Sequence, residues 1–182
     1  MSMSKSHDDV SLIECSEAEH ADAILEILND AIVNSTALYD YVPRPREAMA
    51  TWFATKRAGG FPVVGAIDAS GRLLGFASWG MFRAFPAYKY TVEHSVYVHR
   101  DHRGRGLGER LLRELIRRAR EAQVHVLVGC IDASNAGSIG LHTRLGFFHT
   151  GTMPQVGFKF GRWLDAAFYQ LTLETPAEPR DG

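Results

Sequence analysis

A glycine-rich turn between a strand and a helix constrains this chain more than any other feature. Residues 89–99 have the pattern of a long strand, and residues 103–108 read Arg-Gly-Arg-Gly-Leu-Gly. Apolar residues then follow at helical spacing to about Gln123. The first N–H groups of a helix have no partner within the helix, and the helix dipole adds partial positive charge there. Glycine lets the backbone approach a phosphate closely because it has no Cβ. The turn therefore predicts a site for a phosphate-bearing ligand.

The spacing within the turn separates three nucleotide-binding motifs. A Walker A loop ends in Gly-Lys-Ser/Thr, whereas this turn continues as Leu-Gly-Glu. The Rossmann spacing Gly-x-Gly-x-x-Gly, counted from Gly104, places its third glycine on Glu109. The spacing Arg-x-x-Gly-x-Gly from Arg103 instead resembles the acetyl-CoA signature of the GCN5-related N-acetyltransferase (GNAT) superfamily. The alternative is a glycine-rich turn with two solvated arginines and no ligand.

Residues 135–147 are similar to the fourth-helix block of the same superfamily. Asn135, Ser138 and His142 are three and seven positions apart, so they share one face of a helix, which Gly146 ends. The resemblance implies that Asn135 and Ser138 contact CoA. Asn135 is also a good helix N-cap, and both roles are compatible.

Two further segments, residues 91–98 and 153–163, narrow the resemblance to the phosphinothricin and methionine-sulfoximine acetyltransferase family. The similarity runs from about Val10 to Leu173. It implies acetyl-CoA as donor, a small amino-acid analogue acetylated on its α-amine, and a homodimer. The wider superfamily usually has Tyr where this chain has His142, and the narrower family shares the His.

The expected fold is α/β: a GNAT fold with a mixed central sheet of about seven strands, splayed in the middle and flanked by about four helices. Hairpin signals interrupt the alternation of strands and helices, which is why the sheet should be mixed. The predicted strands are residues 10–15, 62–67, 72–79, 89–99, 124–131, 147–152 and 163–173. The predicted helices follow Ser16, follow Pro45 as far as Gly59–Gly60, and cover residues 107–123 and 135–145. One domain, residues 10–174, should lie between disordered segments at 1–9 and 175–182.

Glu93 is the candidate general base, because an amine attacks a thioester only in its neutral form. The reference pKa of an α-amine is roughly 7.7–8.0, so a group that accepts the ammonium proton is expected. Glu93 lies in an otherwise uncharged strand, where partial burial would raise its pKa. The alternative is a solvent-facing strand carboxylate. His94 follows it in the strand, should point to the opposite face, and is not paired with it.

The other predicted roles rest on the family resemblance and on charge. His142 either protonates the leaving thiolate or only shapes the CoA groove. A backbone N–H between Val96 and Val98 should stabilise charge on the carbonyl oxygen. Arg83 is placed to bind the substrate carboxylate with its planar guanidinium. The predicted substrate-binding set is Phe82, Arg83, Val92 and Lys159. The predicted cofactor-binding set is Val96, Tyr97, Val98, Arg103, Gly104, Arg105, Gly106, Leu107, Gly108, Asn135 and Ser138.

Composition excludes several other classes of protein. Lys plus Arg number 20 and Asp plus Glu number 21, which does not favour nucleic acid or an anionic membrane. No apolar run reaches the roughly 20 residues of a membrane span. The eight histidines show no metal-ligand spacing. Cys15 and Cys130 are predicted to be buried, reduced thiols of a cytoplasmic protein. Two alternative functions remain: acetylation of a protein N-terminus or lysine, and non-enzymatic binding of acetyl-CoA.

Overall fold

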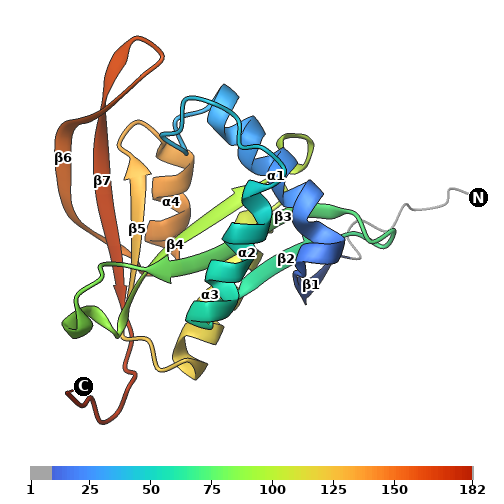
Figure 1. Ribbon diagram of the computed structural model, residues 1–182. Helices are drawn as coiled ribbons and strands as arrows, with labels where there is room; N and C mark the ends of the chain where they lie inside the picture. Colours follow the sequence, from blue (N-terminus) through green and yellow to red (C-terminus); the bar gives the residue numbers. More distant parts are fainter. Residues whose placement is uncertain (1–9, 182) are drawn as a thin grey trace, which may run out of the picture.

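Figure 1 shows the chain as a computed structural model that describes residues 10–181. Seven strands form one mixed sheet in the order β1-β2-β3-β4-β5-β7-β6. The strands are β1 (Ser11–Glu14), β2 (Val63–Ile67), β3 (Leu73–Met81), β4 (Thr91–Val98), β5 (Val126–Asp132), β6 (Phe148–Lys159) and β7 (Arg162–Thr172). The α-helices are α1 (Glu17–Asn34), α2 (Ala48–Gly59), α3 (Leu107–Glu121) and α4 (Ala136–Arg144). The predicted α/β class, with a mixed seven-stranded sheet and four helices, is confirmed.

The middle of the sheet is splayed, as predicted. β4 and β5 are parallel neighbours, but their pairing covers only Thr91–Glu93 opposite Val126–Val128. Beyond that point β4 pairs with β3 as far as Val98, and β5 pairs with β7 as far as Asp132. The edge of β4 after Glu93 that faces away from β3 is therefore outside any ladder. A space opens between the two diverging strands.

The two sheet faces carry separate hydrophobic clusters. α3 contributes its buried stripe, including Leu111 and Leu115, to one cluster, and α1 and α2 contribute to the other. The neighbouring residues Val63 and Val64 of β2 belong to different clusters, as expected for the two faces of a strand. Both helical layers thereby hold β3 and β4 in place beside the splayed region.

Two local predictions need correction. α2 begins at Ala48, so Pro45 lies in the preceding turn, where its carbonyl accepts the Ala48 N–H. α1 follows Ser16 as predicted, and the Ser16 hydroxyl caps it by accepting the Glu19 N–H. The strand predicted at 147–152 continues to Lys159, because a register shift between Met153 and Gly157 accommodates the proline between them.

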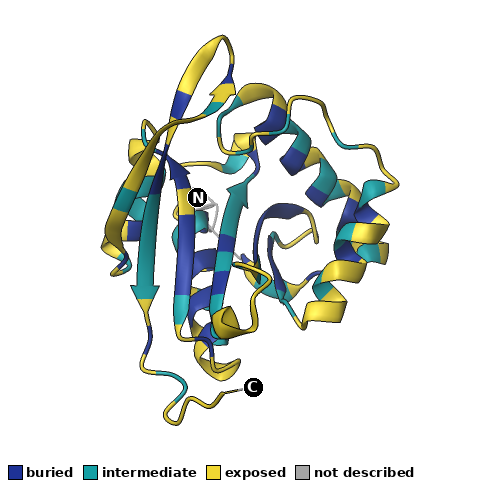
Figure 2. Cartoon of the chain, turned by 60° about the vertical axis from the view of Figure 1, so that its left-hand side comes forward, coloured by how far each residue is buried: buried dark blue, intermediate teal, exposed yellow. Residues whose placement is uncertain are grey.

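β6 and β7 form a long hairpin that extends past the end of β5 at one edge of the sheet (Figure 1). Its turn places Phe160 and Gly161 at positive φ. Figure 2 shows that β6 is exposed along most of its length. Residues 175–181 form no helix or strand, although the Thr175 carbonyl contacts His125 Nδ1 at 2.8 Å. Disorder of this tail stays a prediction, and the segment 1–9 and Gly182 lie outside the described residues.

None of the helices in residues 10–181 is long and apolar enough to cross a membrane.

Candidate active site

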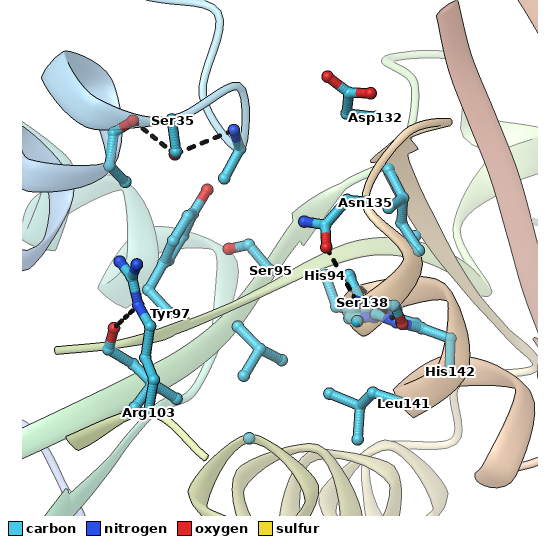
Figure 3. Close-up of a pocket in the computed structure, with 18 of the residues that line it drawn as sticks. Ser35, His94, Ser95, Tyr97, Arg103, Asp132, Asn135, Ser138, Leu141 and His142 are labelled. Carbon is cyan, nitrogen blue, oxygen red and sulfur yellow. Dashed lines mark hydrogen bonds between the residues drawn. The ribbon is translucent and has the colours of Figure 1, made fainter. Parts of the chain in front are cut away.

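The divergence of β4 and β5 creates a cavity of about 730 Å³. In the close-up of Figure 3, Asn135, Ser138 and His142 of α4 lie on one side, and Ser35, Tyr97 and Arg103 lie on the other. The wall consists of six segments: Ile27 and Ala31 of α1, residues 35–39 after α1, 93–98 of β4, the turn and first residues of α3, 129–132 of β5, and one face of α4 with its N-cap. The cavity thus brings together segments that are far apart in the sequence.

The glycine-rich turn lines one end of this cavity and has the conformation that a ligand-binding turn requires. Gly104 and Gly106 have φ values of 74° and 75°, and Gly106 is the N-cap of α3. A Cβ built on either glycine meets no heavy atom of the described chain within 4 Å. The space in front of the helix N-terminus therefore suits the pyrophosphate of a nucleotide-type cofactor.

The two arginines of the turn already have protein partners. Arg103 lines the cavity, where its guanidinium lies 3.2 Å from Asp30 and donates to the Val98 carbonyl. Arg105 Nη1 lies 3.0 Å from His102 Nδ1, and Arg105 does not line the cavity. Of the two arginines, Arg103 is therefore the one whose positive charge, together with the helix dipole, lies at the cavity.

Glu93 lies at the fork, in the last residue pair between β4 and β5. Burial of its carboxylate raises its pKa, and the positive charge of Arg83 partly opposes that shift. Arg83 Nη1 lies 4.0 Å from Glu93 Oε2, and both side chains are partly exposed. The Arg83 guanidinium also stacks on the Phe82 ring. A carboxylate in this environment binds a proton more readily than an exposed Glu does, which suits a proton acceptor near neutral pH.

His94 points to the other face of β4 and pairs with His142. Their Nε2 atoms are 2.9 Å apart, and His142 Nδ1 lies 2.7 Å from the Ser138 carbonyl. A carbonyl only accepts, so His142 carries its proton on Nδ1 and its Nε2 accepts from His94. Burial, followed by the charge of His142, lowers the pKa of His94 to about 3. Gly129 makes room, because a Cβ there would lie 3.2 Å from both rings. The pair is therefore neutral and fixed.

All four predicted substrate-binding residues lie outside the cavity wall, in ways that the structure explains. Val92 is buried in the core cluster that includes Leu127. Lys159 is buried, and its ammonium donates to the carbonyls of Ile32, Ser35 and Leu38. It holds the segment after α1 that forms part of the wall. The Phe82 ring stacks against the Arg83 guanidinium. Arg83 reaches the cavity only by its contact with Glu93, which does line the wall.

Several residues that line the cavity carry no pattern by which the sequence would have identified them as site residues: Thr36, Tyr39, Ser95 and Cys130. Asp132 also lines the cavity and was not predicted. The prediction that Cys130 is buried is wrong, because the splay exposes this part of β5, whereas Cys15 is buried as predicted. The sequence does hold one signal for Asp132. The run Asp-Ala-Ser-Asn has the spacing of an Asx turn before a helix N-cap, and Asp132 Oδ1 accepts the Ser134 N–H.

Ten of the eleven predicted cofactor-binding residues line the cavity, and Arg105 is the exception. They are residues 96–98 of β4, the turn with Leu107 and Gly108, Asn135 and Ser138. Asn135 also caps α4 by accepting the Ser138 N–H. No group of three or more His, Cys, Asp or Glu that could hold a metal occurs in residues 10–181. The site thus combines the N-terminus of α3, a stretch of β4 edge without a neighbouring strand, and the partly buried carboxylate of Glu93.

The chain matches the family model described as the acetyltransferase (GNAT) family over residues 23–147. It is 52% identical, over 83% of its length and 88% of the other protein, to an L-methionine sulfoximine/L-methionine sulfone acetyltransferase of Pseudomonas aeruginosa. A solved structure from Acinetobacter baylyi ADP1, described as a candidate acetyltransferase, shares 67% identity at a TM-score of 0.96, covering 97% of this chain and 99% of that one. The solved structure of a phosphinothricin acetyltransferase from Sinorhizobium meliloti in complex with acetyl-CoA shares 36% identity at a TM-score of 0.89. That match covers 94% of this chain and 93% of the other.

Proposed function

Because the chain belongs to the GNAT acetyltransferase family, we propose that it acetylates the α-amine of a small amino-acid-like substrate of the methionine sulfoximine, methionine sulfone or phosphinothricin type. Acetyl-CoA is the donor that this family uses. The names of the relatives support the substrate class. The observation that carries the proposal is the pair formed by Arg83 and Glu93.

Arg83 and Glu93 together match the zwitterion of an amino acid. The guanidinium and the carboxylate lie 4.0 Å apart and both remain partly exposed. An α-amino acid carries its carboxylate and ammonium on one carbon, so the two charges can engage the two side chains at the same time. Arg83 then holds the substrate carboxylate, and Glu93 accepts a proton from the ammonium, directly or through water.

The remaining roles follow from the cavity wall. Bound acetyl-CoA would supply a thioester, whose carbonyl the neutral amine attacks. The Gly104–Gly106 turn and the N-terminus of α3 would hold its pyrophosphate, and Asn135 and Ser138 would line the pantetheine arm. The edge of β4 from Val96 to Val98 offers backbone N–H groups to the carbonyl oxygen as negative charge develops there.

His142 is assigned the role of shaping the groove. Protonating a thiolate would require a proton on Nε2, but in the neutral pair this atom accepts from His94. A thiolate is a tolerable leaving group and needs no acid. The His94–His142 pair instead fixes α4, and with it Asn135 and Ser138, against the fork of the sheet.

The assembly that we propose is a homodimer formed through the β6–β7 hairpin. β6 is the edge strand of the sheet, and the hairpin exposes a group of large apolar side chains: Phe148, Met153, Val156, Phe158, Phe160 and Trp163. An apolar patch on an edge strand is typical of a surface that another chain covers. We place the enzyme in the cytoplasm, where acetyl-CoA is available and the free thiols Cys15 and Cys130 stay reduced.

The experiment is a thiol-release assay with acetyl-CoA and a panel of acceptors. We expect release of CoA with methionine sulfoximine, methionine sulfone or phosphinothricin, and little release with the corresponding decarboxylated amines. Arg83→Ala should raise KM for the amino acid far more than KM for acetyl-CoA. Equal kcat/KM for an amino acid and for its decarboxylated amine would show that Arg83 does not bind the substrate carboxylate. Activity with peptides alone would instead establish a protein acceptor, and acetyl-CoA binding without turnover would establish a binding module.

A further inference from the structure

The carboxylate of Asp132, at the end of β5, faces the cavity with one oxygen unused. Its side chain is only 2% exposed. Oδ1 accepts two hydrogen bonds from Ser134, from the backbone N–H at 2.7 Å and from the hydroxyl at 2.6 Å. Oδ2 is buried and has no hydrogen bond of good geometry in residues 10–181. The Thr36 hydroxyl is nearby, and the Arg162 guanidinium lies 3.9 Å away on a half-exposed side chain.

Asp132 lies on the same face of the sheet as the proposed acceptor groups. Side chains alternate along a strand, and the Cβ direction of Gly129 points at His94 and His142 on the α4 side. Cys130 therefore points to the opposite side, and the charge of Glu93 acts on its thiol. Asp132, two residues further on, follows Cys130 on that side. Figure 3 shows it at the end of the cavity where Ser35 lies, away from Leu141 and His142.

The distance from Glu93 to Asp132 leaves room for an amino acid between the two carboxylates. Glu93 is paired with Val128, and Asp132 lies four residues of strand beyond Val128, which corresponds to roughly 13 Å. An amine held at Glu93 would thus direct the acceptor side chain along β5 toward Asp132. Tyr39 lines this part of the cavity, and the charges of Asp132 and Cys130 both act on its hydroxyl.

Building on the function proposed above, we propose that Asp132 is a specificity-determining residue: it selects acceptors with a neutral side chain, above all one with an N–H or O–H for Oδ2, and rejects acceptors with an anionic side chain. A buried acceptor without a hydrogen bond is unfavourable, and a ligand donor would satisfy it. An anion in the same place would face a carboxylate across a poorly solvated space. Arg162 alone does not offset this, since it lies beyond hydrogen-bond distance and is half exposed.

Asp132 is ionised when the substrate arrives. Burial opposes ionisation, but the hydrogen bonds from Ser134, the Thr36 hydroxyl and the charge of Arg162 outweigh it, so the pKa of Asp132 lies below its usual value. The carboxylate therefore discriminates by charge at neutral pH as well as by hydrogen bonding.

The test compares acceptors of similar shape that differ in charge: methionine sulfoximine with phosphinothricin, and glutamine with glutamate. We expect wild type to have the higher kcat/KM for the neutral member of each pair. Asp132→Asn keeps an oxygen for Ser134 and removes the charge. It should lower the neutral-to-anionic ratio of kcat/KM at least tenfold, mainly through a lower KM for the anionic acceptor, with KM for acetyl-CoA unchanged.

The matched control is Asp22→Asn, an exposed carboxylate of α1 outside the cavity wall. This control should leave the neutral-to-anionic ratio of kcat/KM for both acceptor pairs within about twofold of its wild-type value. A ratio that is unchanged in Asp132→Asn, with activity retained, overturns the role of Asp132 and leaves the proposed function standing. An equal loss with every acceptor overturns it in favour of a structural role. Wild type that acetylates none of the amino acids overturns the proposed function and this inference together. If Asp132→Asn does not fold, Asp132→Ser, which keeps an oxygen for the turn, replaces it.

Discussion

A half-buried carboxylate beside a guanidinium, as Glu93 lies beside Arg83, experiences two opposing effects. Burial favours the protonated form and Arg83 favours the ionised form, and in Glu93 burial dominates, so its pKa is raised. The basic form is therefore lost as pH falls through a value above the usual range of a glutamate. We expect wild-type kcat/KM to rise with pH through this range and to continue rising as the substrate ammonium itself loses its proton.

Glu93→Gln should lower kcat by about 10²–10⁴-fold near neutral pH, with acetyl-CoA affinity intact, because the side chain keeps its shape and loses its basicity. The deficit should shrink as pH rises, since more substrate then arrives as the neutral amine. Steady-state kinetics from about pH 6 to about pH 10 measure this, and a weakly basic amine acceptor, already neutral at pH 7, serves as the control. A deficit that stays constant over this range would assign Glu93 to charge-based orientation of the ammonium. A Glu93→Gln variant with the kcat of wild type would show that Glu93 takes no part in the reaction.

At the scale of elements, the proposed function has the N-terminus of α3 bind the cofactor through backbone groups, so binding should respond to a change of backbone conformation and shape. Gly106→Val puts a β-branched side chain at φ 75°, in the space in front of the helix. We expect acetyl-CoA binding to weaken at least tenfold, or about 1.4 kcal/mol. Gly71→Val is the matched control, because Gly71 has φ 84° and equally open surroundings in the β2–β3 turn. Calorimetry that gives both variants the same affinity would show that the turn does not hold the pyrophosphate.

The connection after α1 depends on a second element, the β6–β7 hairpin. Lys159 donates to three carbonyls at the end of α1 and beyond, including that of Ser35, which lines the cavity. Lys159→Met should destabilise the protein by about 1–3 kcal/mol, because the carbonyls lose charged donors. KM for the amino acid should rise, since this wall loosens. Lys56→Met, which removes one bond to the Trp79 carbonyl away from the cavity, should leave that KM unchanged. Denaturant unfolding and kinetics of both variants give the comparison.

The parts of this site that could be predicted from the sequence are the local ones. The Arg103–Gly108 turn and the Asn135 cap are defined by residues within a few positions of each other, so their spacing was sufficient. The His94–His142 pair depends on how α4 packs on β4 across Gly129. Because 48 positions separate the two residues, no pattern within one segment of the sequence could predict the pair. Lys159 was misassigned for the same reason, because its carbonyl partners lie more than 120 positions away.

At the scale of the whole molecule, the sheet determines the position of both the proposed active site and the proposed dimer contact. The splay between β4 and β5 opens the cavity in the middle of the sheet, and β6 leaves the far edge exposed. Tyr41 links the two regions, because its hydroxyl donates to the Phe158 carbonyl of the hairpin while its own segment follows the cavity wall. Covering the hairpin would therefore also stabilise the segment that bounds the cavity.

The proposed homodimer gives a direct prediction for the hairpin. Phe160 and Trp163 are 58% and 59% exposed, so replacing both with Glu costs the isolated chain little and places two negative charges in an apolar contact. We expect light scattering after size exclusion to give a dimer for wild type and a monomer for Phe160→Glu/Trp163→Glu. Phe85→Glu, at a residue that is 74% exposed on the β3–β4 connection, is the control and should remain a dimer. Wild type that is monomeric at micromolar concentration would contradict the dimer. A monomeric double variant with an unchanged KM for the amino acid would show that the dimer contact does not stabilise the cavity wall. In that case Lys159 alone, by its hydrogen bonds to the Ser35 and Leu38 carbonyls, holds residues 35–39 in place.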